Sequence, residues 1–394
     1  MKRVILSMLA VSALVVTSCS SDSDETPQVV APTTYTFVGK DGKSNVSFTG
    51  QEARWVMASE LKSALGGDTK TLAQLNEMFK DGKGFVGTIP SNGTSVNDSG
   101  KKLRETVASA TNSNTTTVEE EALRTKLDGY LAAHAAIDFN ADASNGTAGK
   151  LETVGGGRTV YVDAKGYEMN QAVAKTLIGS VFVDQIVNKY VSEGLINESI
   201  AGNNTGTPHK DNADNNYTSL QHYWDEAYGY TFGLETTPAT PVNDSSNRKG
   251  FLNSYLTSVD GDPKFNVFDE IYDAFKLGRA AIDAKQYDVV HAQAKIIREN
   301  VSLVIGVMAA HYLQKGKGVK NPDSLHALSE AVGFVQSLRF AHVNGVQIPQ
   351  NSVDQSLAPL ANLWTVTDAQ LDQVAGIIAQ QFGFNVEDVI DLKN

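Results

Sequence analysis

The sequence predicts an all-α protein built from two pseudo-repeated helical bundles, with a small N-terminal β-hairpin and one further minor hairpin. Three observations predict this class. Apolar residues recur in steps of three and four over long stretches, most clearly at 287–315, as on the buried face of a helix. Thr-x-x-Glu capping boxes precede two such stretches. A nine-residue motif occurs once in each half of the chain, which indicates duplication.

The two hairpins are expected in the first half of the chain. Residues 35–48 alternate polar and apolar side chains around a turn at Gly39–Gly42, a pattern typical of a short hairpin. A second hairpin is expected where 151–154 and 159–162 flank three consecutive glycines. Both are too short to form the core of a sheet protein.

The helices account for most of the remaining chain. Two are expected to begin at the capping boxes Thr49–Glu52 and Thr117–Glu120, and the two helices that carry the repeated motif at the polar caps Thr218 and Asp323. Periodicity predicts helices at 49–65, 69–80, 101–110, 117–138, 168–191, 218–231, 266–284, 287–315, 323–340 and 367–382.

A connection between two halves is expected at 235–250, where two prolines stand among turn-forming residues. It divides the folded part into an N-terminal helical half with the hairpins, 35–234, and a C-terminal helical half, 251–394.

The N-terminus resembles a bacterial lipoprotein signal peptide, 1–18. Lys2 and Arg3 precede an apolar run, Val4–Val16, that is too short to span a bilayer. Small residues then lead to Cys19, the residue that is lipidated in lipoproteins. Ordinary secretory cleavage beside an incidental cysteine is the alternative.

The segment 19–34 is polar, acidic and contains proline, as a flexible tether does. We therefore expect an outer-membrane lipoprotein of the cell envelope, attached to the membrane through Cys19 and either periplasmic or surface-exposed.

Composition excludes several other classes. Among 394 residues, 33 Lys and Arg stand against 45 Asp and Glu, a net charge of −12, which disfavours a nucleic-acid partner. The single cysteine excludes an intramolecular disulfide and a cysteine-clustered zinc site. If that cysteine is lipidated, any site chemistry comes from oxygen and imidazole groups.

The repeated motif, H-x-x-x-E-A-x-G-aromatic, lies at 222–230 and 326–334. Positions i, i+4 and i+7 of a helix share one face, so the His, Glu and Gly of each copy form a stripe. The stripes are His222, Glu226 and Gly229 in the first copy, and His326, Glu330 and Gly333 in the second. Glycine weakens a helix by about 1 kcal/mol relative to alanine, and its expected role here is to let another backbone come close.

Two interpretations of the stripes stay open. If the halves are related by a pseudo-twofold axis, the stripes face each other and form a His2Glu2 site for iron, zinc or manganese. Otherwise they are buried hydrogen-bonded pairs that fix the packing. The candidate metal ligands are His222, Asp225, Glu226, His326 and Glu330.

The first copy is also rich in aromatic residues. Trp224 and Tyr228 are candidates for binding a flat apolar cofactor such as a porphyrin, with core packing as the alternative. Arg279, in an apolar helical stretch, is a third candidate and is expected to be a counter-ion of Glu226 or Glu330, or to reach solvent.

Five segments together resemble one family. They are Ser47–Arg54, Val162–Glu168, His222–Tyr230, Leu277–Ile282 and His326–Phe334. The chain resembles the domain-of-unknown-function 4856 family of bacterial lipoproteins, which is similar to imelysin-like cell-envelope proteins. That resemblance implies an all-helical double bundle linked to iron uptake. The imelysin-like hallmark is Gly-x-His-x-x-Glu, and the matching stretch here has Leu220 and Asp225 at its ends.

We therefore expect a non-enzymatic, lipid-anchored envelope protein that binds a metal or metal complex, in iron or haem acquisition, through the paired His/Glu helices. The cofactor is then a divalent metal or an iron complex, and the partner an envelope transport protein. One alternative is a metal-dependent, peptidase-like hydrolase in which Glu226 or Asp225 is the base beside a metal on His222. The other is a purely structural or interaction module.

Overall fold

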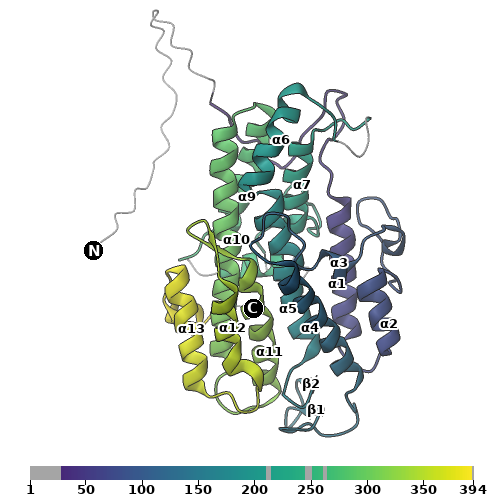
Figure 1. Cartoon of the computed structure of the whole chain (residues 1–394), viewed down its shortest axis with the longest axis vertical. Helices are drawn as coiled ribbons and strands as arrows, with labels where there is room; N and C mark the ends of the chain where they lie inside the picture. Colours follow the sequence, from purple (N-terminus) through teal and green to yellow (C-terminus); the bar gives the residue numbers. More distant parts are fainter. Residues whose placement is uncertain (1–27, 210–213, 245–250, 261–263, 393–394) are drawn as a thin grey trace, which may run out of the picture.

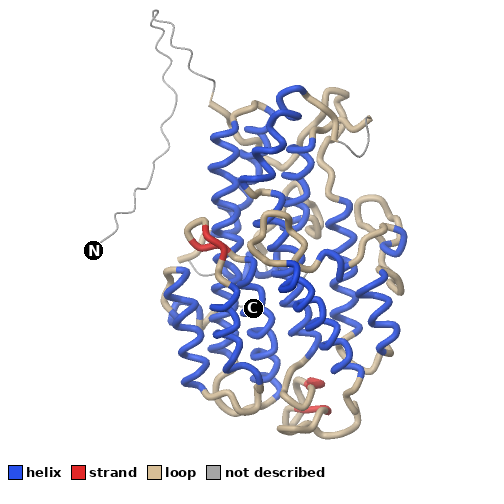
Figure 2. Tube along the Cα trace, viewed as in Figure 1, coloured by secondary structure: helices blue, strands red, loops and turns tan. Residues whose placement is uncertain are grey.

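The computed structural model of the protein describes residues 28–209, 214–244, 251–260 and 264–392. These residues are mostly helical, with two small antiparallel hairpins (Figures 1 and 2), so the predicted all-α class is confirmed. The predicted signal peptide, Cys19 and the first part of the tether lie outside the described residues, as does the end of the predicted connection.

The first half of the chain contains seven labelled α-helices. They are α1 (Thr49–Ala64), α2 (Leu72–Asn76), α3 (Leu103–Thr106), α4 (Thr117–Ala135), α5 (Met169–Leu177), α6 (Glu193–Thr205) and α7 (Ser219–Phe232). Short helical turns of other kinds continue or join them. These are η1 (Glu77–Asp81), η2 (Val96–Asp98), η3 (Ile178–Val183) and η4 (Ile186–Tyr190).

The second half is longer in helix. Its α-helices are α8 (Phe251–Asp260), α9 (Val267–Asp283), α10 (Tyr287–Lys315), α11 (Pro322–Ser337), α12 (Gln350–Leu357) and α13 (Asp368–Phe382). Its 3-10 turns are η6 (Leu338–Phe340), η7 (Ala358–Ala361) and η8 (Val386–Val389). Periodicity did not predict α6, α8 or α12, of which α8 and α12 are only 10 and 8 residues long.

Three of the predicted helix starts are corrected by one or two residues. Helix α1 begins at Thr49, so the residue at its cap position is Phe48. The apolar side chain of Phe48 makes no capping hydrogen bond and packs against Gly229 of α7. Helix α4 has its capping box one residue earlier, between Thr116 and Glu119. Helix α11 is capped by Asn321 rather than Asp323, with proline at its first turn. The cap at Thr218 is confirmed.

The strands form only small hairpins. The predicted second hairpin is present as β1 (Gly149–Glu152) and β2 (Thr159–Val162), paired antiparallel from Gly149–Val162 to Glu152–Thr159. At 35–48 the pairing is limited to a single bridge between Val38 and Ser44. An additional hairpin, not predicted, joins β3 (His342–Val343) and β4 (Val346–Gln347).

The predicted helix at 168–191 is a continuous helical run from α5 through η3 and η4, and two of its segments are π-helical. Asp184 lies between those segments and is fully buried. It accepts hydrogen bonds from the Ala110 amide and from Asn188, each at 3.0 Å. Burial, only partly opposed by these two bonds, raises the pKa of Asp184 to about 7.

Helices from the two predicted halves pack against each other. Helix α7 packs on α1 and on α9, while α5 packs on α11, and α10 contacts α9, α11 and α13 (Figure 1). The Glu168 amide donates to Ser329 Oγ across the α5–α11 contact, at 2.8 Å. Buried apolar residues from both halves therefore form one core.

Helix α10 is the only helix of the described residues that is long and apolar enough to span a membrane by length and composition. In the structure, 78% of its most apolar stretch is buried inside the protein. Its apolar character is accounted for by its central place in the core.

Candidate functional site

The two repeated glycines allow close helix contacts, as the motif predicted. A Cβ at Gly229 would overlap the Phe48 side chain on the way into α1. A Cβ at Gly333 would overlap Lys175 and lie 2.9 Å from the Ala172 carbonyl oxygen on α5. Each copy of the motif therefore places its His–Glu pair beside a different helix, α1 for the first and α5 for the second.

In the first pair, His222 and Glu226 are only loosely associated, and Glu226 has a closer partner, Gln51, on α1. His222 Nε2 and Glu226 Oε2 are 3.9 Å apart, too far for a hydrogen bond. Gln51 Nε2 donates to Glu226 Oε1 at 2.9 Å. The His222 ring stacks on Tyr217, with centroids 4.9 Å apart. The pair thus contributes to the packing of α7 on α1.

The second pair lies in a cluster of buried charges. His326 Nδ1 lies 2.6 Å from Glu168 Oε2, closer than the 3.7 Å between His326 Nε2 and Glu330 Oε2. Lys175 Nζ lies 3.0 Å from Glu330 Oε1. Burial would raise the pKa of Glu330, but Lys175, His326 and Lys62 together outweigh it and the pKa is lowered. Lys175 and burial together lower the pKa of Lys62, on α1, to about 8.

The predicted His2Glu2 cluster is not formed. Within the described ranges, no three or more His, Cys, Asp or Glu side chains are arranged to hold a metal ion. The reason is geometric, because the two motif helices pack against different neighbours rather than face to face. In the Glu168–His326–Glu330 group, Lys175 already pairs with one of the two carboxylates.

Arg279 of α9 is the centre of a second buried network. Its Nε lies 3.2 Å from Asp225 Oδ1 on α7, and both side chains are 0% exposed. Its two terminal nitrogens bind Asp283 and, at 3.1 Å, Asn45 Oδ1. The Tyr35 hydroxyl donates to the same Asp225 oxygen at 2.6 Å. The network joins α7, α9 and the segment before α1.

This network corrects the predicted partners of Arg279. Its counter-ions are Asp225 and Asp283, not Glu226 or Glu330. Residue 225 is one place before the motif glutamate, so it faces a different neighbour of α7. Burial raises the pKa of Asp225 to about 7 although Arg279 and Tyr35 act against that rise. Asp225 is therefore held in a buried ion pair and hydrogen-bond network that joins α7 to α9.

The two aromatic candidates are core residues. Trp224 is fully buried, donates from Nε1 to the Phe275 carbonyl at 2.9 Å, and lies against Gly278 of α9, where a Cβ would overlap its indole ring. Tyr228 stacks on Tyr35, with centroids 3.6 Å apart and an interplanar angle of 2°. Its hydroxyl donates to a backbone carbonyl. Trp224 therefore packs the core, while one side of Tyr228 borders a cavity described below.

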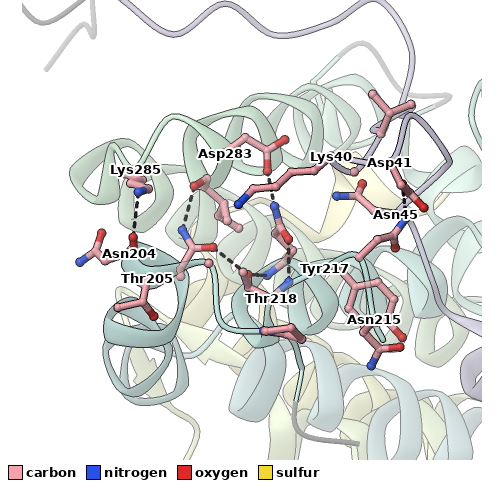
Figure 3. Close-up of a pocket in the computed structure, with 18 of the residues that line it drawn as sticks. Lys40, Asp41, Asn45, Asn204, Thr205, Asn215, Tyr217, Thr218, Asp283 and Lys285 are labelled. Atoms are coloured by element: carbon pink, nitrogen blue, oxygen red, sulfur yellow. Dashed lines mark hydrogen bonds between the residues drawn. The ribbon is translucent and has the colours of Figure 1, made fainter. Parts of the chain in front are cut away.

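A polar pocket of about 600 Å³ (Figure 3) shares two lining residues, Asn45 and Asp283, with the Arg279 network. Its walls come from the turn before α1, the end of α6, the start of α7 and the end of α9. The polar side chains that line it are Lys40, Asp41, Asn45, Asn203, Asn204, Thr205, Asp214, Asn215, Asn216, Tyr217, Thr218, Gln221, Asp283 and Lys285.

Hydrogen bonds among the lining residues hold the pocket in shape. Gln221 donates to Asp283 and Asn216 donates to Asp41, at 2.7 and 3.0 Å. Lys40 extends across the pocket from the turn (Figure 3). A Cβ at Gly206, at the end of α6, would lie 3.5 Å from its ammonium nitrogen. The pocket thus combines a hydrogen-bonded lining with a long cationic side chain that extends across it.

The family comparison agrees with the resemblance noted in the sequence. A family profile described as "Domain of unknown function (DUF4856)" matches residues 32–385. The chain belongs to the DUF4856 family. No curated protein and no solved structure matches the chain.

In this DUF4856 protein, sequence reasoning missed the pocket and predicted only two of the helices around it, α7 and α9. The pocket residues come from four segments that are far apart in the chain, and none of them forms a periodic pattern. The signal that was present is compositional, because Asn203-Asn204, at the end of α6, and Asn215-Asn216, in the loop before α7, place four carboxamides in two segments. These asparagines line one pocket only when the fold brings the two segments together.

Proposed function

We propose that this protein is a lipid-anchored binding protein of the cell envelope that holds a small, hydroxyl-rich ligand, such as a saccharide, in the polar pocket. The observation that carries the proposal is the chemistry of the lining, which is dominated by carboxamides with carboxylates, ammonium groups and one phenol. The pocket volume falls within the range of roughly 300–1,000 Å³ that is usual for small-molecule sites.

The choice of ligand class follows from what these groups can bind. A carboxamide both donates and accepts hydrogen bonds, as a hydroxyl group does, so neighbouring hydroxyls of a sugar ring find both kinds of partner. An apolar cofactor requires mostly apolar walls. A strongly charged ligand requires a lining of one sign, whereas here the lysines Lys40 and Lys285 are balanced by aspartates.

Ligand binding tests this proposal through a change in thermal stability. Titration of the mature protein with neutral mono- and disaccharides should raise Tm with concentration, since a ligand that binds only the folded state stabilises it by RT ln(1 + [L]/Kd). Lys40→Ala should weaken binding about tenfold or more, because a hydrogen bond from a charged donor contributes about 1.5–3 kcal/mol.

The matched control is Lys43→Ala, which changes a lysine of the same turn that does not line the pocket. It should bind like the wild type. A panel in which no saccharide raises Tm, or in which both lysine variants bind equally, would refute the proposal. Including ferric citrate and haem in the panel tests the metal-complex ligand that the resemblance implies.

The lipid anchor is part of the proposal and has its own test. Cys19→Ser should move the protein from the detergent phase to the aqueous phase in a detergent partition of whole cells, because lipidation supplies the apolar anchor. Ser20→Ala, the adjacent control, should stay in the detergent phase. Equal partition of wild type and Cys19→Ser would contradict lipidation at this residue.

A further inference from the structure

A second cavity, of about 380 Å³, lies at the start of α1 and is separate from the polar pocket. Its walls come from the segment before α1, the loop at Pro90 and Ser91, and the end of α7 with the residues that follow. Three aromatic residues line it together with two carboxyl groups. These are Tyr35, Phe48, Tyr228, Glu52 and Glu235. No Lys or Arg is found among the described lining residues.

The carboxyl group of Glu52 is the unusual feature of this cavity. Glu52 is only 2% exposed. Its carboxylate oxygen Oε2 accepts a hydrogen bond from the Ser91 hydroxyl. Among the described residues, no Lys or Arg forms an ion pair with it. Burial raises the pKa of Glu52, and the bond from Ser91 only partly opposes the rise. A buried carboxylate without a cation is costly, so Glu52 is suited to a positively charged ligand.

The aromatic walls favour the same kind of ligand. The Tyr35 hydroxyl donates a hydrogen bond to Asp225, and the Tyr228 hydroxyl donates one to the Pro238 carbonyl. The two tyrosines stack on each other and are only 2% and 0% exposed, so they close the base of the cavity and offer it no hydrogen-bond donors. Phe48, which is half-buried, supplies the accessible ring surface of the cavity, with its centroid 6.2 Å from that of Tyr228. Aromatic surface attracts cations through the ring quadrupole, and sites for quaternary ammonium groups are built in this way.

We propose that this cavity binds a small organic cation, an alkylated ammonium compound of about the size of choline, with Glu52 as its counter-ion and the Phe48 ring and Val46 beside its alkyl groups. A metal ion fits less well, because hard cations require several oxygen ligands and are not bound by ring carbons. The proposal is independent of the saccharide pocket, which shares no lining residue with this cavity.

Calorimetric titration with a pair of isosteric probes tests the proposal. Choline and 3,3-dimethylbutan-1-ol have nearly the same shape, and only choline is charged. The wild-type mature protein should bind choline at least about tenfold more tightly, because the attraction to the Glu52 carboxylate and to the Phe48 ring acts only on the charged probe. This comparison requires no variant. Equal affinities, or no binding of either probe, would overturn the proposal.

The variant Glu52→Gln then assigns the counter-ion. It keeps the shape and removes the charge, so choline affinity should fall about tenfold or more, while affinity for the neutral alcohol is unchanged. Its Tm without ligand should equal or exceed that of the wild type, since a buried charge without a cation has been removed. Glu198→Gln, an exposed control on α6, should bind both probes normally. Unchanged choline affinity in Glu52→Gln would refute the role of Glu52.

Discussion

Replacing Arg279 with Met is expected to lower the free energy of unfolding by about 3–5 kcal/mol, the usual cost of removing one partner of a buried ion pair. The variant leaves Asp225 fully buried with only the Tyr35 hydroxyl as a donor, and leaves Asn45 Oδ1 without its guanidinium partner. Urea unfolding followed by circular dichroism measures the change, with the m-value checked for constancy.

A second substitution separates the ion pair from simple loss of packing. In the double variant Arg279→Met/Asp225→Leu, part of the lost stability should return, because an apolar pair replaces an unpaired charge. Arg158→Met is the exposed control. Its ion pair with Asp323 joins side chains that are 42% and 68% exposed, so its loss should cost less than about 1 kcal/mol. A loss at Arg279 as small as at Arg158 would show that the network is not structural.

Substitution of the motif glycine Gly333 by Ala is expected to destabilise the protein by up to about 2 kcal/mol. The added methyl group must displace Lys175 or the α5 backbone, and forcing extra atoms into a packed contact costs about 1–3 kcal/mol. The gain in helix propensity, about 1 kcal/mol, offsets only part of the larger cost. Gly229→Ala should behave alike, because its methyl group would meet Phe48.

Gly376 provides a control of opposite sign. It lies inside α13, and no atom would lie within 4 Å of an added Cβ. Gly376→Ala should therefore stabilise the protein by about 0.5–1 kcal/mol through propensity alone. Thermal unfolding of the three alanine variants compares them directly. If Gly333→Ala raised Tm as Gly376→Ala does, the close contact between α11 and α5 would be disproved.

Much of the fold was predictable because helix periodicity is a local property. Helix α10 was predicted with its correct ends, since its apolar positions recur without interruption over 29 residues. The start of α4 was one residue off because consecutive threonines precede consecutive glutamates, and either pairing satisfies the capping-box pattern. Helices α8 and α12 are too short to show a clear period.

The site was predictable only in part, because spacing within one helix says nothing of its neighbour. The i, i+4 spacing correctly placed His326 and Glu330 on one face, but their closest partners, Glu168 and Lys175, are supplied by another part of the chain. The polar pocket forms only where Lys40 lies close to the ends of α6 and α9 in the tertiary structure. Only the tertiary structure brings such residues together.

The packing of α5 on α11 has a consequence for how the chain folds. The Glu168–Ser329 and Gly179–Ser337 hydrogen bonds join residues 161 and 158 positions apart. During synthesis from the N-terminus, α5 is complete long before α11 has been made. The apolar face of α5 therefore remains exposed without its native partner. Folding dominated by such distant contacts is slow and exposes the chain to aggregation. We therefore expect the isolated fragment 28–244 to be insoluble by itself and to be recovered in soluble form when 251–394 is supplied as a second chain.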